Sequence, residues 1–262
     1  MPVIAVKKEV LYEKIGLDEN FSVEQFQDLC FDFGIELDNV VTEKELKSGG
    51  DKTESDVIYY KIEVPANRYD LLCVEGLAYS LAVFMGKKEI LTVNLESSKE
   101  NDFYVKIEKS VEKIRPYIVS AVIKNVELND ESFKSLIELQ EKLHFNICRD
   151  RTLASIGVHN FDALKMPITY KALRNDSKSF VALNETESFT VEQLFNVYRK
   201  RSVCSVRPYL SILEGFDESP FVLDANDNVC SLPPIINSEL TKVSENTKNM
   251  LKFRNAFANC KL

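Results

Sequence analysis

The histidines are the side chains of this sequence that are best suited to proton transfer near neutral pH. There are two, His144 and His159, and neither has a second His or Cys at the spacing of a metal site, so no metal is expected. His159 stands beside Asn160 and close to Asp162, where its imidazole could hydrogen-bond a hydroxyl, a carbonyl or a water that attacks an ester. The alternative is a polar turn at the end of a strand, and the motif alone leaves both open.

A second candidate for chemistry is the segment LPPIINSELTKVSENTK at residues 232–248. Its two prolines remove backbone donors just before a group of polar residues, and a rigid turn of this kind can deliver side chains to a pocket wall. The alternative is that Ser238 or Asn237 caps a helix that runs onward. Asp224 and Asn226 are further candidates because they precede the turn. The candidate pocket residues within the segment are Pro234, Asn237, Ser238, Glu239 and Thr241.

Phosphate chemistry has weaker support. No GxxxxGK[ST] loop and no GxGxxG turn is present, so this chain is not expected to activate an amino acid with ATP. The net charge of −8 opposes non-specific attraction to RNA, so any contact must come from local basic patches. Two clusters could touch a phosphate backbone or form a solvated face: Arg149 with Arg151, and Arg199, Lys200 and Arg201 with Arg207.

The composition indicates a folded protein of the cytoplasm. A chain of 262 residues that is 45% hydrophobic can bury one large core or two ordinary ones. The six cysteines are scattered and form no CxxC, which is typical of free thiols in a reducing compartment. No uncharged run approaches the roughly 20 residues of a membrane span, so no membrane partner is expected.

The first third of the chain predicts a small α+β domain. Residues 3–6 and 57–64 have the β-branched and aromatic content of strands. Residues 22–34 predict a helix with Ser22 as N-cap and Gly34 at its end, and a second helix is predicted over residues 71–84. The polar residues 42–56 predict a loop. A linker is predicted over residues 96–104, so we place the domains at 1–95 and 96–262.

The second part predicts strands mixed with two helices. Strands are expected in residues 105–111 and 117–128, followed by an amphipathic helix that opens with Asp130 as its N-cap. Short strands and a helix near residues 190–200 follow. Such a mixture favours an α+β fold over a doubly wound parallel sheet.

Four blocks of sequence carry a family resemblance. They are YKIEVPANRYDLLCVEGLAYSLAVFMG at 60–86, RPYIVSAVIKNVEL at 115–128, LIELQEKLHFNICRDRTLASIGVHNFDAL at 136–164 and SLPPIINSELTKV at 231–243. In this order they resemble the N-terminal part of the β subunit of archaeal/eukaryotic-type (cytosolic) phenylalanyl-tRNA synthetases. The resemblance covers residues 1–249 and implies a small N-terminal α+β domain followed by a larger mixed-sheet α+β editing domain.

The resemblance also implies a function. In this family the editing domain hydrolyses mischarged Tyr-tRNA(Phe) by attack of water on the aminoacyl ester, without a covalent intermediate. It implies tRNA(Phe) and the α subunit of a heterotetramer as partners. The fragment itself would need no cofactor, because ATP and Mg²⁺ belong to the full synthetase. The alternative is a non-catalytic fragment that binds tRNA or acts as a scaffold for the subunits.

Site residues follow from the same likeness. The VHNFD and INSEL segments resemble their counterparts in bacterial relatives, which implies His159, Ser238 and Glu239 as catalytic residues. After residue 249 the family continues with a strand of FIE.T.TD character, whereas this chain reads MLKFRNAFANCKL. We therefore expect that strand to be missing, the catalytic-like and later domains to be absent, and the editing domain to be truncated at its C-terminus. The substrate contacts implied are Asn237, Thr241, Pro234 and Asp224, with Arg149, Arg151, Arg199, Lys200 and Arg201 toward tRNA.

Overall fold

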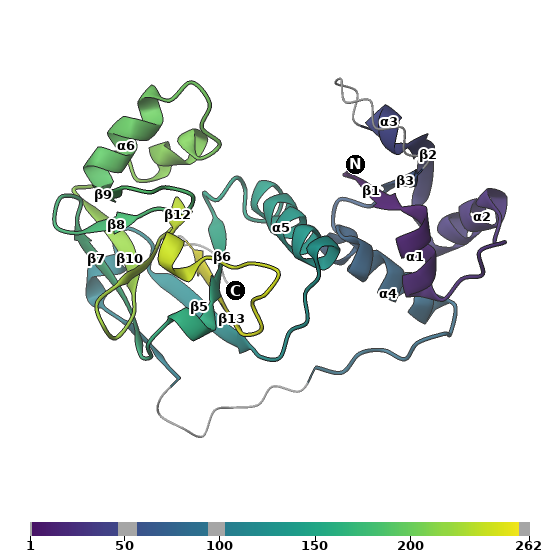
Figure 1. Cartoon of the computed structure of the whole chain (residues 1–262), viewed down its shortest axis with the longest axis horizontal. Coiled ribbons are helices and arrows are strands. Elements are labelled where there is room, and N and C mark those ends of the chain that lie inside the picture. Colours follow the sequence, from purple (N-terminus) through teal and green to yellow (C-terminus); the bar gives the residue numbers. More distant parts are fainter. Residues whose placement is uncertain (1, 47–56, 94–102, 257–262) are drawn as a thin grey trace. The chain divides into compact units, whose positions relative to one another are not determined.

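The computed structural model describes residues 2–46, 57–93 and 103–256. The chain divides into two compact units, Met1–Leu95 and Glu96–Leu262, and each is described by itself (Figure 1). Both combine helices with mainly antiparallel sheet, so the α+β prediction is confirmed. No helix of the described residues is long and apolar enough to cross a membrane. The predicted linker lies outside the described residues, except for residues 103 and 104.

The first unit is a three-stranded antiparallel sheet with helices packed on it. The strand order is β1-β3-β2, so the last strand in sequence lies in the centre. Helix α1 packs against α4, and Tyr60 of β3 lies fully buried against the ring of Phe26 from α2. The elements are β1 (Val3–Lys7), α1 (Lys8–Ile15), α2 (Val23–Phe33), β2 (Glu36–Thr42), α3 (Glu43–Leu46), β3 (Ile58–Glu63) and α4 (Val74–Phe84).

Local sequence determines where two of these helices, α2 and α4, begin. The Ser22 hydroxyl accepts the Gln25 amide at 3.2 Å and the Gln25 side chain accepts the Ser22 amide at 2.8 Å, which confirms the predicted N-terminus of α2. Helix α4 begins three residues later than predicted, because residues 69–71 form a separate 3-10 turn. That turn packs so closely that a Cβ on Gly76 would lie 1.8 Å from the Asp70 carbonyl oxygen. Of the predicted loop at 42–56, residues 43–46 form the short helix α3 and residues 47–56 lie outside the described part.

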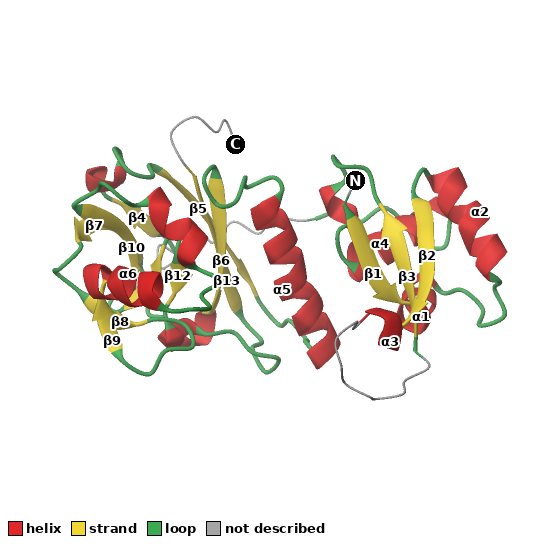
Figure 2. Ribbon diagram, turned by 90° about the horizontal axis from the view of Figure 1, so that it is seen from above, coloured by secondary structure: helices red, strands yellow, loops and turns green. Residues whose placement is uncertain are grey.

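The second unit contains two larger sheets and a two-stranded ribbon. A five-stranded sheet has the order β12-β11-β10-β7-β4 and is antiparallel except for the β4–β7 pair, whereas a three-stranded antiparallel sheet has the order β5-β13-β6. Figure 2 shows α5 beside the three-stranded sheet. The elements are β4 (Val105–Ile107), β5 (Tyr117–Ile123), α5 (Asp130–Phe145), β6 (Ala154–Asn160), β7 (Ile168–Arg174), β8 (Ser179–Val181), β9 (Ser188–Thr190), α6 (Val191–Lys200), β10 (Glu218–Leu223), β11 (Val229–Leu232), β12 (Ile236–Asn237) and β13 (Met250–Ala256).

Three predicted boundaries in this unit are wrong. The strand predicted at 117–128 ends at Ile123. Asn129, and not Asp130, is the N-cap of α5: its side chain accepts the Ser132 amide at 2.8 Å, and the Ser132 hydroxyl accepts the Asn129 amide in return. Asp130 is already in the first turn, where its charge suits the helix dipole. The strand predicted at 105–111 ends at Ile107, because residues 109–111 form a 3-10 turn whose Val111 enters the core.

The expected missing strand is present. Residues Met250–Ala256 form β13, which pairs along all seven residues with β5 on one side and β6 on the other. Leu251 and Phe253 are 1% and 2% exposed and belong to the core. The buried Arg115 donates to the Asn255 side-chain oxygen at 2.8 Å, so β13 also supplies a hydrogen-bond acceptor to a buried charged group. The strand was missed because MLKFRNA does not resemble the family segment, although the alternation from Leu251 to Arg254 is itself a strand signal.

Because β13 is the central strand, removing it should unfold the second unit. We expect a chain that ends at Asn249 to lose the cooperative unfolding transition of that unit, whereas a chain that ends at Ala256 keeps it. Within the full chain, Phe253→Ala should lower the free energy of unfolding by about 3–5 kcal/mol through the cavity it leaves. Thermal and urea unfolding followed by circular dichroism measure both. Unchanged unfolding of the chain that ends at Asn249 would contradict the central role of β13.

Candidate functional site

The second unit holds a cavity of about 510 Å³, which is in the size range of small-molecule sites. Its floor is formed by β6 and β13, one wall by the C-terminal half of α5, another by the end of α6 and the residues after it, and the remaining side by the 233–237 turn. The cavity therefore lies where these five stretches of the chain meet, together with the loop at 183–185.

Alternate residues of β6 provide the floor. Ser155, Gly157 and His159 face the cavity, as the period of two in a strand requires. A Cβ on Gly157 would lie 2.9 Å from His159 Nε2 and 3.3 Å from Asn237 Oδ1. Glycine at this position therefore leaves room between the histidine ring and the Asn237 amide. The ring of Phe253 packs edge-on against His159 at 5.3 Å and closes the floor from below.

His159 is a neutral, fully enclosed side chain. It is 0% exposed, and its Nδ1 lies 2.8 Å from the Thr241 hydroxyl, whose own proton can go to the Cys230 carbonyl at 3.2 Å. When Thr241 donates to Cys230, His159 Nδ1 carries the ring proton and Nε2 is an acceptor. Burial lowers the pKa of His159 to about 3, so the imidazole is uncharged at neutral pH. It is suited to hydrogen bonding and not to holding a positive charge.

Unpartnered polar atoms gather at this cavity. Among the described residues, five buried side-chain nitrogen or oxygen atoms have no hydrogen-bond partner, and four of them belong to residues that line the cavity. Buried polar groups are nearly always paired, because leaving one unpaired costs about 1–3 kcal/mol. The four atoms are Gln140 Oε1, Arg151 Nε, His159 Nε2 and His144 Nδ1, the last of which lies 3.8 Å from Glu141 Oε1.

The α5 wall is held by a chain of polar contacts. His144, which is 2% exposed, accepts the Ile156 amide on Nε2 at 2.9 Å and so ties the end of α5 to β6. Arg151 donates to Glu141 at 3.2 Å and to the Ile235 carbonyl at 3.0 Å. The neighbouring His144 and Arg151 lower the pKa of the Glu141 carboxyl. Arg151 thus joins the helix to the proline turn.

The α6 wall is closed by a second ion pair. Arg201 donates two hydrogen bonds to the Glu185 carboxylate, at 2.6 and 2.7 Å, and the Tyr198 hydroxyl donates to it at 3.2 Å. The Arg201 guanidinium lowers the pKa of Glu185, which therefore stays ionised. Each charged wall of the cavity is locally balanced.

The structure brings part of the expected site together. His159, Asn237, Pro234, Arg151 and Arg201 all line the cavity. Thr241 does not line it but lies directly behind His159 and bonds to its ring.

The two other residues of the INSEL segment lie outside the lining. Ser238 donates to the Val181 carbonyl at 3.2 Å and caps a 3-10 turn at Glu239–Thr241, so the capping alternative holds for a short turn and not for a long helix. Glu239 accepts the Asn184 amide at 2.6 Å and Lys242 Nζ at 3.0 Å. The Asn184 amide, followed by Lys242, lowers the pKa of the Glu239 carboxyl. Because Asn184 lines the cavity, Glu239 reaches the site through that loop.

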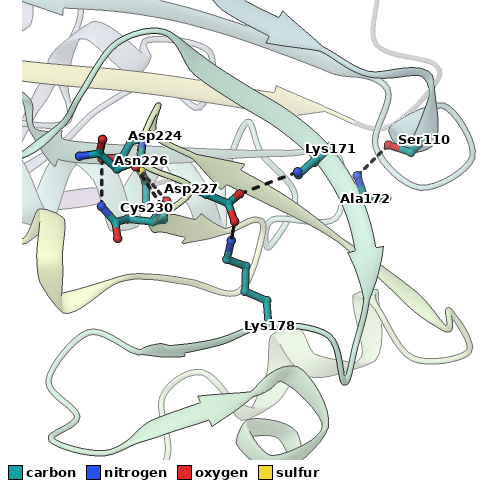
Figure 3. Close-up of polar contacts among 9 residues, drawn as sticks. Ser110, Lys171, Ala172, Lys178, Asp224, Asn226, Asp227 and Cys230 are labelled. Atoms are coloured by element: carbon teal, nitrogen blue, oxygen red, sulfur yellow. Dashed lines mark hydrogen bonds and ion pairs between the residues drawn. The ribbon is translucent and has the colours of Figure 1, made fainter.

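Asp224 lies away from the cavity lining. Its carboxylate accepts the amides of Asn226 and Asn228, at 3.0 and 2.9 Å, and so shapes the turn between β10 and β11 (Figure 3). In the same turn Asp227 pairs with Lys171 and Lys178. An Asp side chain often stabilises a turn by accepting the backbone amides two or more residues later. Asp224 has this role, so its position before the PPIIN segment does not make it face the pocket.

Three of the expected tRNA contacts also lie outside the lining. Arg199 pairs with Glu214 at 2.8 Å, whereas Arg149 and Lys200 are exposed and make no ion pair with a described residue. Arg149 is in the left-handed turn that follows α5, with φ at 49°.

The sequence interpretation missed the α5 and α6 residues of the site. One signal was available: Gln140 and His144 are one helical turn apart and interrupt an otherwise apolar face of α5. No comparable signal marks Glu185, because it lies in a short polar loop. The missed polar residues of the lining are Gln140, Glu141, His144, Ser155, Asn184, Glu185, Tyr198, Ser205, Ser231 and Asn255.

The neutral state of His159 makes a prediction about stability. Its pKa in the folded chain lies below the ordinary value of about 6.5, so the unfolded chain binds more protons between these values. The contribution of neutral His159 to stability is therefore complete above about pH 6.5 and is lost as the pH falls toward 3. From pH 7.5 to 4.5, the free energy of unfolding of the wild type should fall about 2–3 kcal/mol more than that of His159→Gln, as urea titrations would measure. An equal fall in both chains would show that His159 is accessible to protons in the folded state.

Known proteins resemble the chain over nearly its whole length. Residues 1–87 match the family described as the Phe-tRNA synthetase beta subunit B1 domain. The phenylalanine–tRNA ligase beta subunit of Dictyostelium discoideum is 42% identical over 255 residues, which are 95% of this chain and 41% of that protein. The cytoplasmic phenylalanine–tRNA ligase beta subunit of Arabidopsis thaliana is 42% identical over 256 residues, 95% of this chain and 42% of that one. The chain thus spans about two fifths of the length of these relatives.

A solved structure agrees with the fold of both units. The crystal structure of an N-terminal fragment of the phenylalanyl-tRNA synthetase beta subunit from Pyrococcus horikoshii has a TM-score of 0.82 and 31% sequence identity. The match covers 98% of this chain and 69% of that fragment. The four sequence blocks, the fold and these relatives agree, and the chain belongs to the phenylalanyl-tRNA synthetase β-subunit family.

Proposed function

We propose that residues 96–262 form an editing unit that hydrolyses the aminoacyl ester of mischarged Tyr-tRNA(Phe). The observation that carries this proposal is the concentration of unpartnered buried polar atoms at one cavity, four of five in the described residues. A tyrosyl group carries an ammonium, a carbonyl and a phenol hydroxyl, all of which can satisfy such atoms. A pocket that must pair its polar groups rejects a ligand lacking a hydroxyl far better than an apolar pocket does.

The candidate residues then take two kinds of role. His159, Asn237 and Pro234 line the site, and a neutral His159 would hydrogen-bond the substrate or the attacking water. Thr241 fixes the His159 ring, whereas Ser238 and Glu239 hold the neighbouring segment and the Asn184 loop in place. Hydrolysis needs no covalent intermediate, only a positioned water and donors for the charge that develops on the carbonyl oxygen.

The partners follow from the family. The proposal includes tRNA(Phe) as the substrate carrier and the α subunit as the partner in the complete ligase, where ATP and Mg²⁺ would serve aminoacylation and not this unit. The exposed Arg149 and Lys200 are better placed for phosphate contacts than Arg151 and Arg201, because these two are engaged by Glu141 and Glu185. A cytoplasmic location is proposed because the relative from Arabidopsis thaliana carries that word in its name.

A non-catalytic unit that binds tRNA or supports the subunits is the second candidate. It is favoured by one observation: Ser238 and Glu239, two of the three residues expected to be catalytic, are engaged in local contacts outside the cavity lining.

Single-turnover deacylation separates the two candidates. We expect the 262-residue chain to clear tyrosine from Tyr-tRNA(Phe) and to leave Phe-tRNA(Phe) intact. Asn237→Ala should slow the clearance at least about tenfold, because it removes one polar group of the cavity, worth roughly 1.4 kcal/mol or more in the transition state. Asn226→Ala is the matched control, since its side chain lies on the exposed turn between β10 and β11, and its rate should stay within about twofold of wild type. A folded chain that clears neither ester would favour the non-catalytic unit.

A further inference from the structure

Among the described residues, strand β6 pairs with β13 on one side only, as the last strand of the β5-β13-β6 sheet. Its other edge meets the cavity at Ile156 and Gly157, and Val158, which is 7% exposed, lies next to the lining. The backbone groups of successive strand residues point alternately to the two sides. Because the Ile156 amide points to His144 on α5, the backbone groups of Ile156 and Val158 are directed away from β13, and those of Gly157 toward it.

Two side chains hold this edge at its ends. His144 Nε2 accepts the Ile156 amide at 2.9 Å, and Asn237 Nδ2 donates to the Val158 carbonyl at 3.3 Å. The Ile156 carbonyl and the Val158 amide lie between these two side-chain contacts. Neither group forms a hydrogen bond in the described part of the chain. Ile156 and Gly157 both line the cavity and are partly exposed to it.

A carbonyl and an amide on either side of one residue form a specific pattern. In a parallel β-bridge, a residue of the neighbouring strand donates its N–H to the first group and accepts from the second with its carbonyl. The ligand that matches this pattern is a single α-amino-acid unit, whose amino group and carbonyl are separated by one carbon.

We propose that the cavity binds its substrate by pairing the amino-acid backbone with the free edge of β6, between His144 and Asn237. The α-amino group donates to the Ile156 carbonyl, and the ester carbonyl accepts from the Val158 amide. The ligand class is an α-amino acid in ester or amide linkage with a free amino group, whatever its side chain. The proposal deepens the editing function and rests on it for the identity of the ester.

This placement also assigns a role in the reaction. When the water oxygen bonds to the ester carbon, the carbonyl oxygen becomes negative, and the Val158 amide is a fixed donor toward it. The bond to the ribose oxygen then breaks, one proton of the water passes to that oxygen, and free amino acid and the tRNA hydroxyl result. His144 is a positioning residue: only with its proton on Nδ1 can Nε2 hold the Ile156 amide.

Binding of non-hydrolysable probes to the full chain tests the pairing by nuclear magnetic resonance. With L-tyrosinamide, we expect the Val158 amide proton to shift downfield and its hydrogen exchange to slow, and L-phenylalaninamide should cause the same shift but bind more weakly, because it lacks the hydroxyl. Tyramine lacks the carbonyl and should leave the Val158 amide unshifted. The propanamide that lacks the amino group, 3-(4-hydroxyphenyl)propanamide, should bind roughly tenfold more weakly than L-tyrosinamide. No saturable binding of L-tyrosinamide, or binding with an unmoved Val158 amide, would overturn the proposal.

A backbone substitution gives a second measurement. Val158→Pro removes the amide that points away from β13, a position where an edge strand accommodates proline. It should weaken L-tyrosinamide binding about tenfold, whereas Val158→Ala, which keeps the amide, should bind as wild type does. Equal affinities of the two folded variants would count against the proposal, and if Val158→Pro does not fold, the resonance shifts of the wild type decide.

Failure of the pairing and failure of the editing function give different results. Selective hydrolysis of Tyr-tRNA(Phe) with an unmoved Val158 amide would remove the backbone pairing and leave the editing function. A shifted Val158 amide without hydrolysis would support the pairing and remove the editing function.

Discussion

The position of β13 between β5 and β6 is the constraint on which the second unit depends. The backbone of β13 forms hydrogen bonds with both β5 and β6. The side chains of its residues Phe253 and Asn255 line the cavity. Asn255 accepts a hydrogen bond from the buried Arg115. Burial lowers the pKa of Arg115 to about 10, which is still well above neutral pH, so the guanidinium keeps its charge. A buried cation is costly unless its donors are satisfied, so this arrangement ties the far end of the chain to residue 115 as well as to the sheet.

The polar side chains that line the cavity depend on the pairing of β6 with β13. Strand β6 can present Ser155, Gly157 and His159 to one side only because β13 fixes its register. The walls are then added by contacts that each join two elements, such as His144 to β6, Arg151 to the proline turn and Arg201 to the Glu185 loop. Leaving polar atoms unpaired in such a frame lowers stability, which is the usual relation between a binding site and the fold that carries it.

The sequence predicted those parts of the structure that rest on local chemistry. The N-cap of α2 at Ser22, the helix near residues 190–200, the strand at 58–63 and the polar character of the Asn237 turn are all visible in short stretches of residues. The central position of β13 could not be predicted, because it depends on pairing with strands that are about 90 and 130 residues earlier in sequence. Glu239 and Asp224 were misplaced for a related reason: a carboxylate in a turn bonds to whichever amides the fold brings near, and residue type alone does not tell a turn former from a pocket group.

The close approach of Gly76 to the Asp70 carbonyl has a consequence for how such chains are recognised. Any side chain at this position would force the 3-10 turn away from α4, so glycine is required at residue 76. The PANRYDLLCVEG segment lies within residues 1–87, which match the family model, and in the unit that contributes no lining residue to the cavity. Family likeness thus extends over both units, whereas the cavity belongs to the second alone. A relative could therefore keep the first unit, and be recognised by it, after mutation had removed the cavity.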